Sequence, residues 1–220
     1  MNPDVPRPPG TLVIFGGWFF SRVVAETAEL LGWTIAGFVD PDPPGWVTPL
    51  RHVPDESFAI VAIGNNPQRA FVHGKVLERG RRVVSIIHPT ASVSQSAVLE
   101  KGCYLAEYVT VRSAAVVGSG TILNSGSVVS HDCQIGPFVT FGPNAATSGH
   151  VSIGARTTLG VGACVRPHAK IGCDCEVGAG AAVACDIRDG STVVGVPARA
   201  IPKRSAKQDK QSDWSANPIW

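Results

Sequence analysis

The stretch VVGSGTILNSGSVVSHDCQI, residues 116–135, carries an aliphatic side chain at every sixth position. The same spacing continues on both sides, and every position in it except Thr147 is large and apolar: Val93, Leu99, Leu105, Val111, Val117, Leu123, Val129, Ile135, Phe141, Thr147, Ile153, Leu159, Val165, Ile171, Val177 and Val183. A six-residue period does not fit an α-helix, but it fits a chain that turns a corner every six residues. Three such sides make an 18-residue coil, and stacked coils bury the aliphatic residues.

Glycines support this interpretation. In several repeats a glycine directly follows the aliphatic residue, at Gly118, Gly136, Gly154, Gly172 and Gly178. Glycine suits corners where a Cβ would crowd the backbone or where φ is positive. The pattern predicts a left-handed parallel β-helix of hexapeptide repeats, with about five to six stacked coils between Thr90 and Arg199. Such helices are the known departure from the right-handed crossover rule.

Composition excludes several other classes. The net charge is +2, and the segment after residue 201, with four basic and two acidic residues, accounts for all of it. The rest of the chain is therefore neutral, so nucleic acid is not the expected partner. No apolar run is long enough to span a membrane, so we expect no membrane insertion. The N-terminus lacks a signal-peptide pattern, and none of the six cysteines forms a CxxC pair, so we expect a cytoplasmic protein.

A smaller unit precedes the repeats. Apolar runs predict strands at Thr11–Phe15, Thr34–Val39, Ala59–Ile63 and Val83–Ile86, and helical spacing predicts helices at Ser21–Leu31 and Pro67–Glu78. Alternating strands and helices indicate a small parallel α/β sheet of the Rossmann-like kind. The expected domains are therefore residues 1–87, a β-helix over residues 88–202, and a polar tail over residues 203–220.

The carboxyl ends of the predicted strands bear Gly16, Gly17, Asp40, Gly64 and Asn65. Ligands of parallel sheets bind at this edge, so these residues predict a nucleotide or nucleotide-sugar pocket. Asp40 would accept hydrogen bonds from a ribose or base, and the glycines would approach a phosphate. The alternative is that the glycines only close tight turns, because the third glycine of the usual fingerprint is missing.

One segment of the repeats carries residues suited to acyl transfer. His131 suits a general base, and the adjacent Asp132 can orient its ring. Gly149 lies 18 residues further, one coil along, where its N–H can stabilise an oxyanion. The alternative is a surface histidine of an ordinary repeat. Asp132, His150 and His168 share the 18-residue spacing, so we expect them to form a column on one side of the β-helix. This column could be structural, could contact a neighbouring subunit or could bind a metal, and we favour the subunit contact.

These motifs resemble the bacterial sugar O-/N-acetyltransferases of the sialic-acid O-acetyltransferase type. That family includes the N-acetyltransferases of nucleotide-linked 4-amino-sugars such as bacillosamine and perosamine precursors. The resemblance covers about Leu12 to Ile201 and rests on these segments: Phe38-Val39-Asp40, Ala62-Ile63-Gly64-Asn65, Ile87-His88-Pro89-Thr90-Ala91, Asn124-Ser125-Gly126, Ser130-His131-Asp132-Cys133 and Gly195-Val196-Pro197-Ala198-Arg199.

The resemblance implies a homotrimer that binds acetyl-CoA between adjacent β-helices and a nucleotide-linked amino-sugar on the front domain, with no metal required. It makes His131 the base, Asp132 its orienter and Gly149 the N–H donor to the thioester carbonyl, with Asn124 lining the site. It places the coenzyme along Gly149, Gly160, Val161, Gly162, Pro167 and Arg199.

The chain departs from the family at two places. Trp18-Phe19-Phe20 replaces a Gly-His-Gly-type loop, so Trp18 is expected to stack on the substrate or close its pocket. Thr140 stands where relatives often carry a second histidine, and its hydroxyl can still donate a hydrogen bond to the substrate.

The leading prediction is an acetyl-CoA-dependent N-acetyltransferase of a nucleotide-linked amino-sugar. The alternatives are an O-acetyltransferase of the sialic-acid type and a non-catalytic scaffold. A γ-type carbonic anhydrase is disfavoured because Gly136 stands where its closely spaced zinc histidine would fall.

Overall fold

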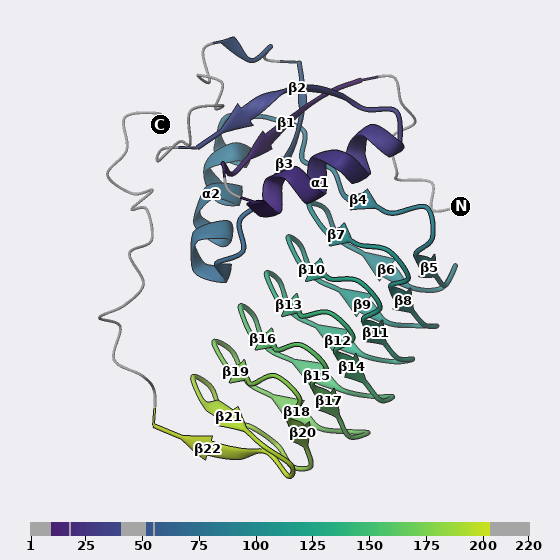
Figure 1. The fold of residues 1–220 in the computed structure, drawn as a ribbon, viewed down its shortest axis with the longest axis vertical. Coiled ribbons are helices and arrows are strands. Elements are labelled where there is room, and N and C mark those ends of the chain that lie inside the picture. The colour runs from purple at the N-terminus through teal and green to yellow at the C-terminus, as the bar shows by residue number, and fades with distance from the viewer. Residues whose placement is uncertain (1–9, 18, 41–51, 55, 203–220) are drawn as a thin grey trace. The chain divides into compact units, whose positions relative to one another are not determined.

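The computed structural model describes residues 10–17, 19–40, 52–54 and 56–202 (Figure 1). Trp18 and the tail over residues 203–220 therefore lie outside the described residues. The chain divides between Ile86 and Ile87 into two compact units. No helix among the described residues is long and apolar enough to cross a membrane.

The front unit is a three-stranded parallel sheet with two helices. Its strands are β1 (Thr11–Phe15), β2 (Thr34–Val39) and β3 (Phe58–Val61), in the order β2-β1-β3. The helices are α1 (Phe19–Leu30) and α2 (Asn66–Glu78). These elements confirm five of the predicted ones, with two strands matching at both ends. A cluster of buried apolar side chains from these strands and from α2 forms the core, which explains why short apolar runs located them.

The predicted fourth strand at Val83–Ile86 is wrong. Val83 makes only an isolated parallel bridge to Ala59, with Val84 N–H donating to the Ala59 carbonyl at 3.0 Å. The end of the apolar run instead forms β4 (Ile86–Ile87), which belongs to a sheet of the β-helix. An apolar run shows that a segment is buried, but it does not show which sheet the segment joins.

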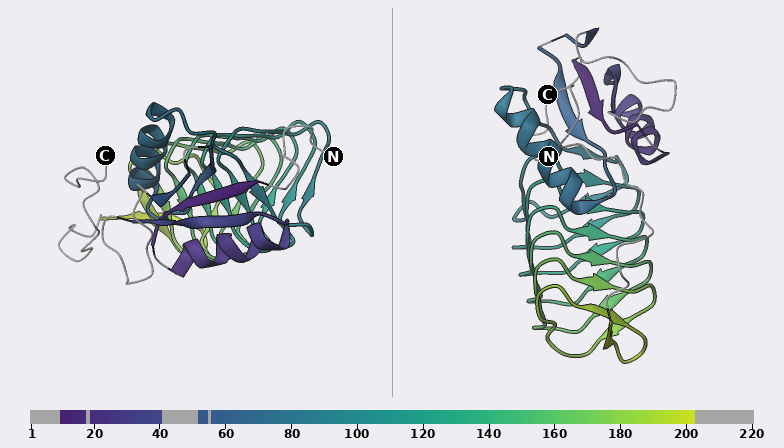
Figure 2. Two further views of the ribbon diagram at one scale, coloured as in Figure 1. Left: turned by 90° about the horizontal axis from the view of Figure 1, so that it is seen from above. Right: turned by 90° about the vertical axis from the view of Figure 1, so that its left-hand side faces the viewer.

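The second unit is a β-helix with three flat faces, and its coils lie stacked in Figure 2. The eight-stranded face contains β4, β7 (Tyr104–Leu105), β10 (Ile122–Leu123), β13 (Thr140–Phe141), β16 (Thr158–Leu159), β19 (Glu176–Val177), β21 (Thr192–Val194) and β22 (Arg199–Ile201). The six-stranded face contains β5 (Ser92–Val93), β8 (Thr110–Val111), β11 (Val128–Val129), β14 (Ala146–Thr147), β17 (Cys164–Val165) and β20 (Ala182–Val183). The five-stranded face contains β6 (Val98–Leu99), β9 (Val116–Val117), β12 (Gln134–Ile135), β15 (Ser152–Ile153) and β18 (Lys170–Ile171).

Strands of neighbouring coils pair in parallel with a register of 18 residues, for example Ile122 with Thr140. The second residue of each short strand points inward, and Leu123, Phe141 and Leu159 have no exposed surface. Thr147, the polar member of the series, is also buried, and its Oγ1 accepts a hydrogen bond from Ser130 N–H at 3.1 Å. A hydrogen-bonded hydroxyl is tolerated inside a core, so the series continues through this position.

The five predicted corner glycines, which directly follow inward-facing residues, are explained by close packing of the coils and not by positive φ. None of the five has a positive φ. A Cβ at Gly118 would lie 2.6 Å from the Pro137 nitrogen of the next coil. Positive φ occurs instead at the corners, and Asp132, His150 and His168 follow one another there with φ of 58°, 60° and 60°. We call the corner that carries these residues the histidine corner.

Candidate active site

His131 and Asp132 form a pair at the histidine corner, between β11 and β12. His131 Nδ1 lies 2.7 Å from Asp132 Oδ2, and the two side chains are 52% and 44% exposed. The hydrogen bond from His131 is the main cause that lowers the pKa of the Asp132 carboxyl, and it outweighs partial desolvation. An ionised carboxylate can only accept, so Nδ1 carries the proton and Nε2 of the neutral ring keeps its lone pair. The pair has the geometry that a general base and an orienting carboxylate would need.

Gly149 lies against the ring of His131 from the next coil. A Cβ at this position would fall 2.5 Å from His131 Nε2 and closer still to Cε1. The ladder joins the coils here, because His150 N–H donates to the His131 carbonyl and His168 N–H donates to the Gly149 carbonyl, both at 3.1 Å. The absence of a side chain at Gly149 leaves room for the imidazole where it stands.

The column of Asp132, His150 and His168 is also brought together. His150 Nε2 lies 3.8 Å from Asp132 Oδ2. The His150 ring is perpendicular to that of His131, with centroids 5.2 Å apart, and is stacked on that of His168 at 4.8 Å and 4°. Within the described residues, ligand atoms of His131, Asp132 and His150 lie within 4.8 Å of one another, which is close enough to hold a metal ion.

Most of the other predicted β-helix residues lie away from the histidine corner. Asn124 follows β10 at the opposite edge of the six-stranded face, and its Nδ2 donates to the Phe141 carbonyl at 2.7 Å. Val161, 54% exposed, follows β16 at the same edge, between Gly160 and Gly162. We call this the asparagine corner. Pro167 lies at the histidine corner, Thr140 lies in β13, and Arg199 begins β22, where its guanidinium donates to the Ala198 carbonyl.

The predicted front-unit residues meet at the carboxyl ends of the three strands. Gly17 N–H donates a short hydrogen bond to the buried carboxylate of Asp40, which joins the ends of β1 and β2. Gly16 has a φ of 134°, a conformation that favours glycine. Asn65 caps α2 by accepting from Gln68 N–H at 2.8 Å. Gly16, Gly17 and Asp40 thus determine the backbone conformation at the carboxyl ends of these strands.

Sequence analysis missed Arg69, whose side chain is 1% exposed. Its guanidinium donates to the Ile63 carbonyl at 2.7 Å, the Gly64 carbonyl at 3.2 Å and Asn66 Oδ1 at 2.7 Å. It therefore fixes the turn that carries Gly64. The helical spacing of Arg69 with the buried Val72 and Val76 could have indicated that it lies on the inward face of α2, although not which groups it contacts.

Sequence analysis also missed Glu107 at the asparagine corner. Its carboxylate accepts from Ser125 Oγ at 2.9 Å. A backbone hydrogen bond of Glu107 itself, then Ser125, and then the charge of His88 lower its pKa. The 18-residue step from Glu107 to Ser125 could have revealed this contact.

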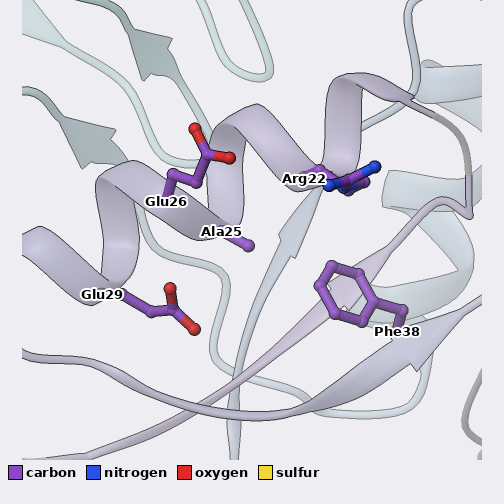
Figure 3. Close-up of a pocket in the computed structure, with 5 residues that line it drawn as sticks. All are labelled: Arg22, Ala25, Glu26, Glu29 and Phe38. Atoms are coloured by element: carbon purple, nitrogen blue, oxygen red, sulfur yellow. The ribbon is translucent and has the colours of Figure 1, made fainter.

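The front unit also has an open hollow of about 320 Å³ between α1 and β2, shown in Figure 3. It contains none of the predicted site residues, and its lining combines both charges: Arg22, Ala25, Glu26, Glu29 and Phe38. We assign it no role.

A β-helix of hexapeptide repeats with a histidine–carboxylate pair at its corner defines a hexapeptide-repeat acyltransferase. Comparison with known proteins narrows the class. Residues 11–76 match the family described as the PglD N-terminal domain. A curated relative, GDP-perosamine N-acetyltransferase of Escherichia coli O157:H7, is 35% identical over 90 residues, and the match spans 41% of each protein.

Two groups of solved structures cover most of both chains. PerB from Caulobacter crescentus, in complex with CoA and GDP-perosamine, is 37% identical with a TM-score of 0.83, over 88% of this chain and 98% of PerB. The acetyltransferase domain of PglB from Neisseria gonorrhoeae, in complex with acetyl coenzyme A, is 33% identical with a TM-score of 0.80, over 88% and 100%. The chain belongs to this family of hexapeptide-repeat sugar acetyltransferases, which confirms the resemblance and the fold class predicted from the sequence.

Proposed function

We propose that the protein transfers the acetyl group of acetyl-CoA to the amino group of a nucleotide-linked amino-sugar. The observation that carries the proposal is the His131–Asp132 pair with Gly149 against its ring, on a chain related throughout to an enzyme that binds CoA and GDP-perosamine. A 4-amino-sugar linked to a nucleoside diphosphate is accordingly the substrate class, and acetyl-CoA is the co-substrate.

In the proposed reaction, the sugar amine attacks the thioester carbonyl carbon, and a C–N bond forms. His131 Nε2 accepts the proton that the amine loses, because Nδ1 is committed to Asp132. The N–H of Gly149 stabilises the tetrahedral oxyanion. The C–S bond then breaks, and the CoA thiolate leaves and takes up a proton.

Asp132 orients the ring and stabilises the imidazolium that forms during transfer. The lowered pKa of its carboxyl supports this role, because the group remains charged at neutral pH. Asp132 acts only through His131 and is therefore a positioning residue.

The separation of Asn124 from His131 supports a homotrimer. They stand at opposite edges of the six-stranded face, with β11 between them. Within one chain the two residues therefore lie at different corners. We propose that the asparagine corner of one protomer faces the histidine corner of the next. The coenzyme would then lie along the junction and contact Gly149, Gly160, Val161, Gly162, Pro167 and Arg199.

We further propose that residues 1–87 bind the nucleotide-sugar and residues 88–202 perform the transfer. Gly16, Gly17, Asp40, Gly64 and Asn65 would hold the nucleotide, with Arg69 fixing their turn. Thr140 and Trp18, the latter outside the described residues, would contact the sugar. All six cysteines are unpaired, which supports a cytoplasmic location.

The test is an acetylation assay with purified full-length protein, acetyl-CoA and GDP-perosamine, in parallel with the corresponding nucleotide-sugar that bears a hydroxyl in place of the amine. We expect CoA release with the amine only, and a product of acetyl mass that resists mild alkali. An alkali-sensitive product formed from the hydroxyl acceptor would identify an O-acetyltransferase instead. Ligand binding without turnover would identify a scaffold.

A further inference from the structure

We propose that His131, Asp132 and His150 form a binding site for a divalent transition metal of the zinc type, and that the bound metal inhibits acetyl transfer. Two imidazoles and one carboxylate are a donor set that zinc accepts while keeping a fourth position open. Magnesium and calcium prefer sites built from oxygen ligands, so this set discriminates against them.

The three ligand atoms are near the spacing that a zinc ion needs, and moderate side-chain movements would bring them to it. Zinc binds nitrogen and oxygen at about 2.0–2.2 Å in a tetrahedral arrangement, so its ligand atoms lie roughly 3.3 Å apart. Here Asp132 Oδ2 lies 2.7 Å from His131 Nδ1 and 3.8 Å from His150 Nε2. These two separations must change by about half an ångström, and the third, between the imidazole nitrogens of His131 and His150, lies within 4.8 Å and must close by up to about 1.5 Å. All three side chains are half-exposed, at 52%, 44% and 49%, and small rotations supply such shifts.

The backbone holds the three ligands in fixed relative positions. His131 and His150 lie on adjacent coils that are joined by the hydrogen bond from His150 N–H to the His131 carbonyl. Asp132 and His150 occupy equivalent corner positions with nearly equal φ. His168 supports the ring of His150 by stacking on it, but it lies outside the group of three. Little ordering is therefore required when a metal binds.

Inhibition follows from the single lone pair of a neutral imidazole. If the metal takes Nε2 of His131, the base is blocked directly. If the metal takes Nδ1, the ring proton moves to Nε2, which then cannot accept the proton of the amine. This part rests on the proposed function, whereas metal binding itself does not.

Binding is tested on the full-length protein with Co²⁺ alone, followed by its visible absorption, and with Zn²⁺ by calorimetry. The exposed thiols of Cys164 and Cys185 also attract zinc, so a Cys164→Ser/Cys185→Ser protein is the background for every variant. We expect one ion per chain. His150→Asn should weaken binding by at least about tenfold, the smallest cost usual for an outer-shell partner. His168→Asn, a matched control from the same column, should change affinity by less than that.

Inhibition is measured by mass spectrometry of the acetylated sugar, because free CoA would itself bind zinc. Each variant is compared with its own metal-free rate. Zinc should suppress the rate of the background protein, a chelator should restore it, and His150→Asn should be insensitive. Equal binding by the background protein and His150→Asn, or an unchanged rate at saturating zinc, would overturn the site. Binding that depends on His150 in a protein that never acetylates would leave the site standing and refute the proposed function.

Discussion

Gly149→Ala tests the geometry around the proposed base without removing any polar group. The new Cβ would lie 2.5 Å from His131 Nε2 and closer still to Cε1, whereas ordinary contacts begin at 3.4 Å, so the ring must move by about 1.0 Å. The backbone itself tolerates alanine, because Gly149 does not have a positive φ. The mutation therefore displaces the imidazole and leaves the coil intact.

A misplacement of about 1 Å at a catalytic group can reduce the rate about 100-fold. We therefore expect kcat/KM of Gly149→Ala to fall about 100-fold, or about 2.7 kcal/mol in transition-state stabilisation. Initial rates are measured with acetyl-CoA and GDP-perosamine, and folding is monitored by circular dichroism and thermal melting.

The matched control is Gly74→Ala in α2, where an added Cβ meets no atom within 4 Å. It should retain full activity and gain about 0.5–1 kcal/mol of stability, because alanine is the better helix former. A folded Gly149→Ala protein within threefold of the wild-type rate would refute the reasoning, because the position of the His131 ring would then not matter.

Three further outcomes follow from individual contacts. Asp132→Asn should lower kcat about tenfold or more in steady-state kinetics, without exceeding the roughly 10²- to 10⁴-fold contribution of the base itself, because Asp132 only positions His131. Thr147→Val should lower the free energy of unfolding in urea by about 1–3 kcal/mol, because Ser130 N–H loses its acceptor; no change would mean that another group satisfies it. Glu107 has a lowered pKa in the folded state, so its carboxylate stabilises the protein above the pKa of the unfolded state, and this contribution is lost as the pH falls through the folded value. Glu107→Gln should therefore lower the melting temperature at pH 7, and the difference from wild type should vanish in strong acid.

The β-helix could be predicted because its signal is repeated. From Leu105 to Val183, every sixth residue is buried by the same local rule, so one polar member such as Thr147 does not obscure the pattern. The strands Thr11–Phe15 and Thr34–Val39 could be predicted equally well, because both are short apolar runs. The prediction for Val83–Ile86 is wrong because its last residue, Ile86, pairs with the β-helix, and that pairing depends on contacts distant in the sequence.

From the sequence, the contacts of the candidate site could be predicted only between residues that the 18-residue spacing places on neighbouring coils. That spacing relates His131 to Gly149 and Asp132 to His150, and the structure places both pairs side by side. Arg69 escaped because the buried end of its side chain depends on carbonyl groups that no residue pattern displays. The hydrogen bond of Gly17 to Asp40 likewise depends on how closely two strand ends approach.

The most direct test of the catalytic role of His131 is the turnover of His131→Ala with saturating acetyl-CoA and GDP-perosamine. If His131 is the general base, kcat falls by about two to four orders of magnitude while folding, oligomeric state and CoA binding persist. If the folded variant turns over at a rate near that of the wild type, His131 is not the base, and the amine reacts after losing its proton to solvent.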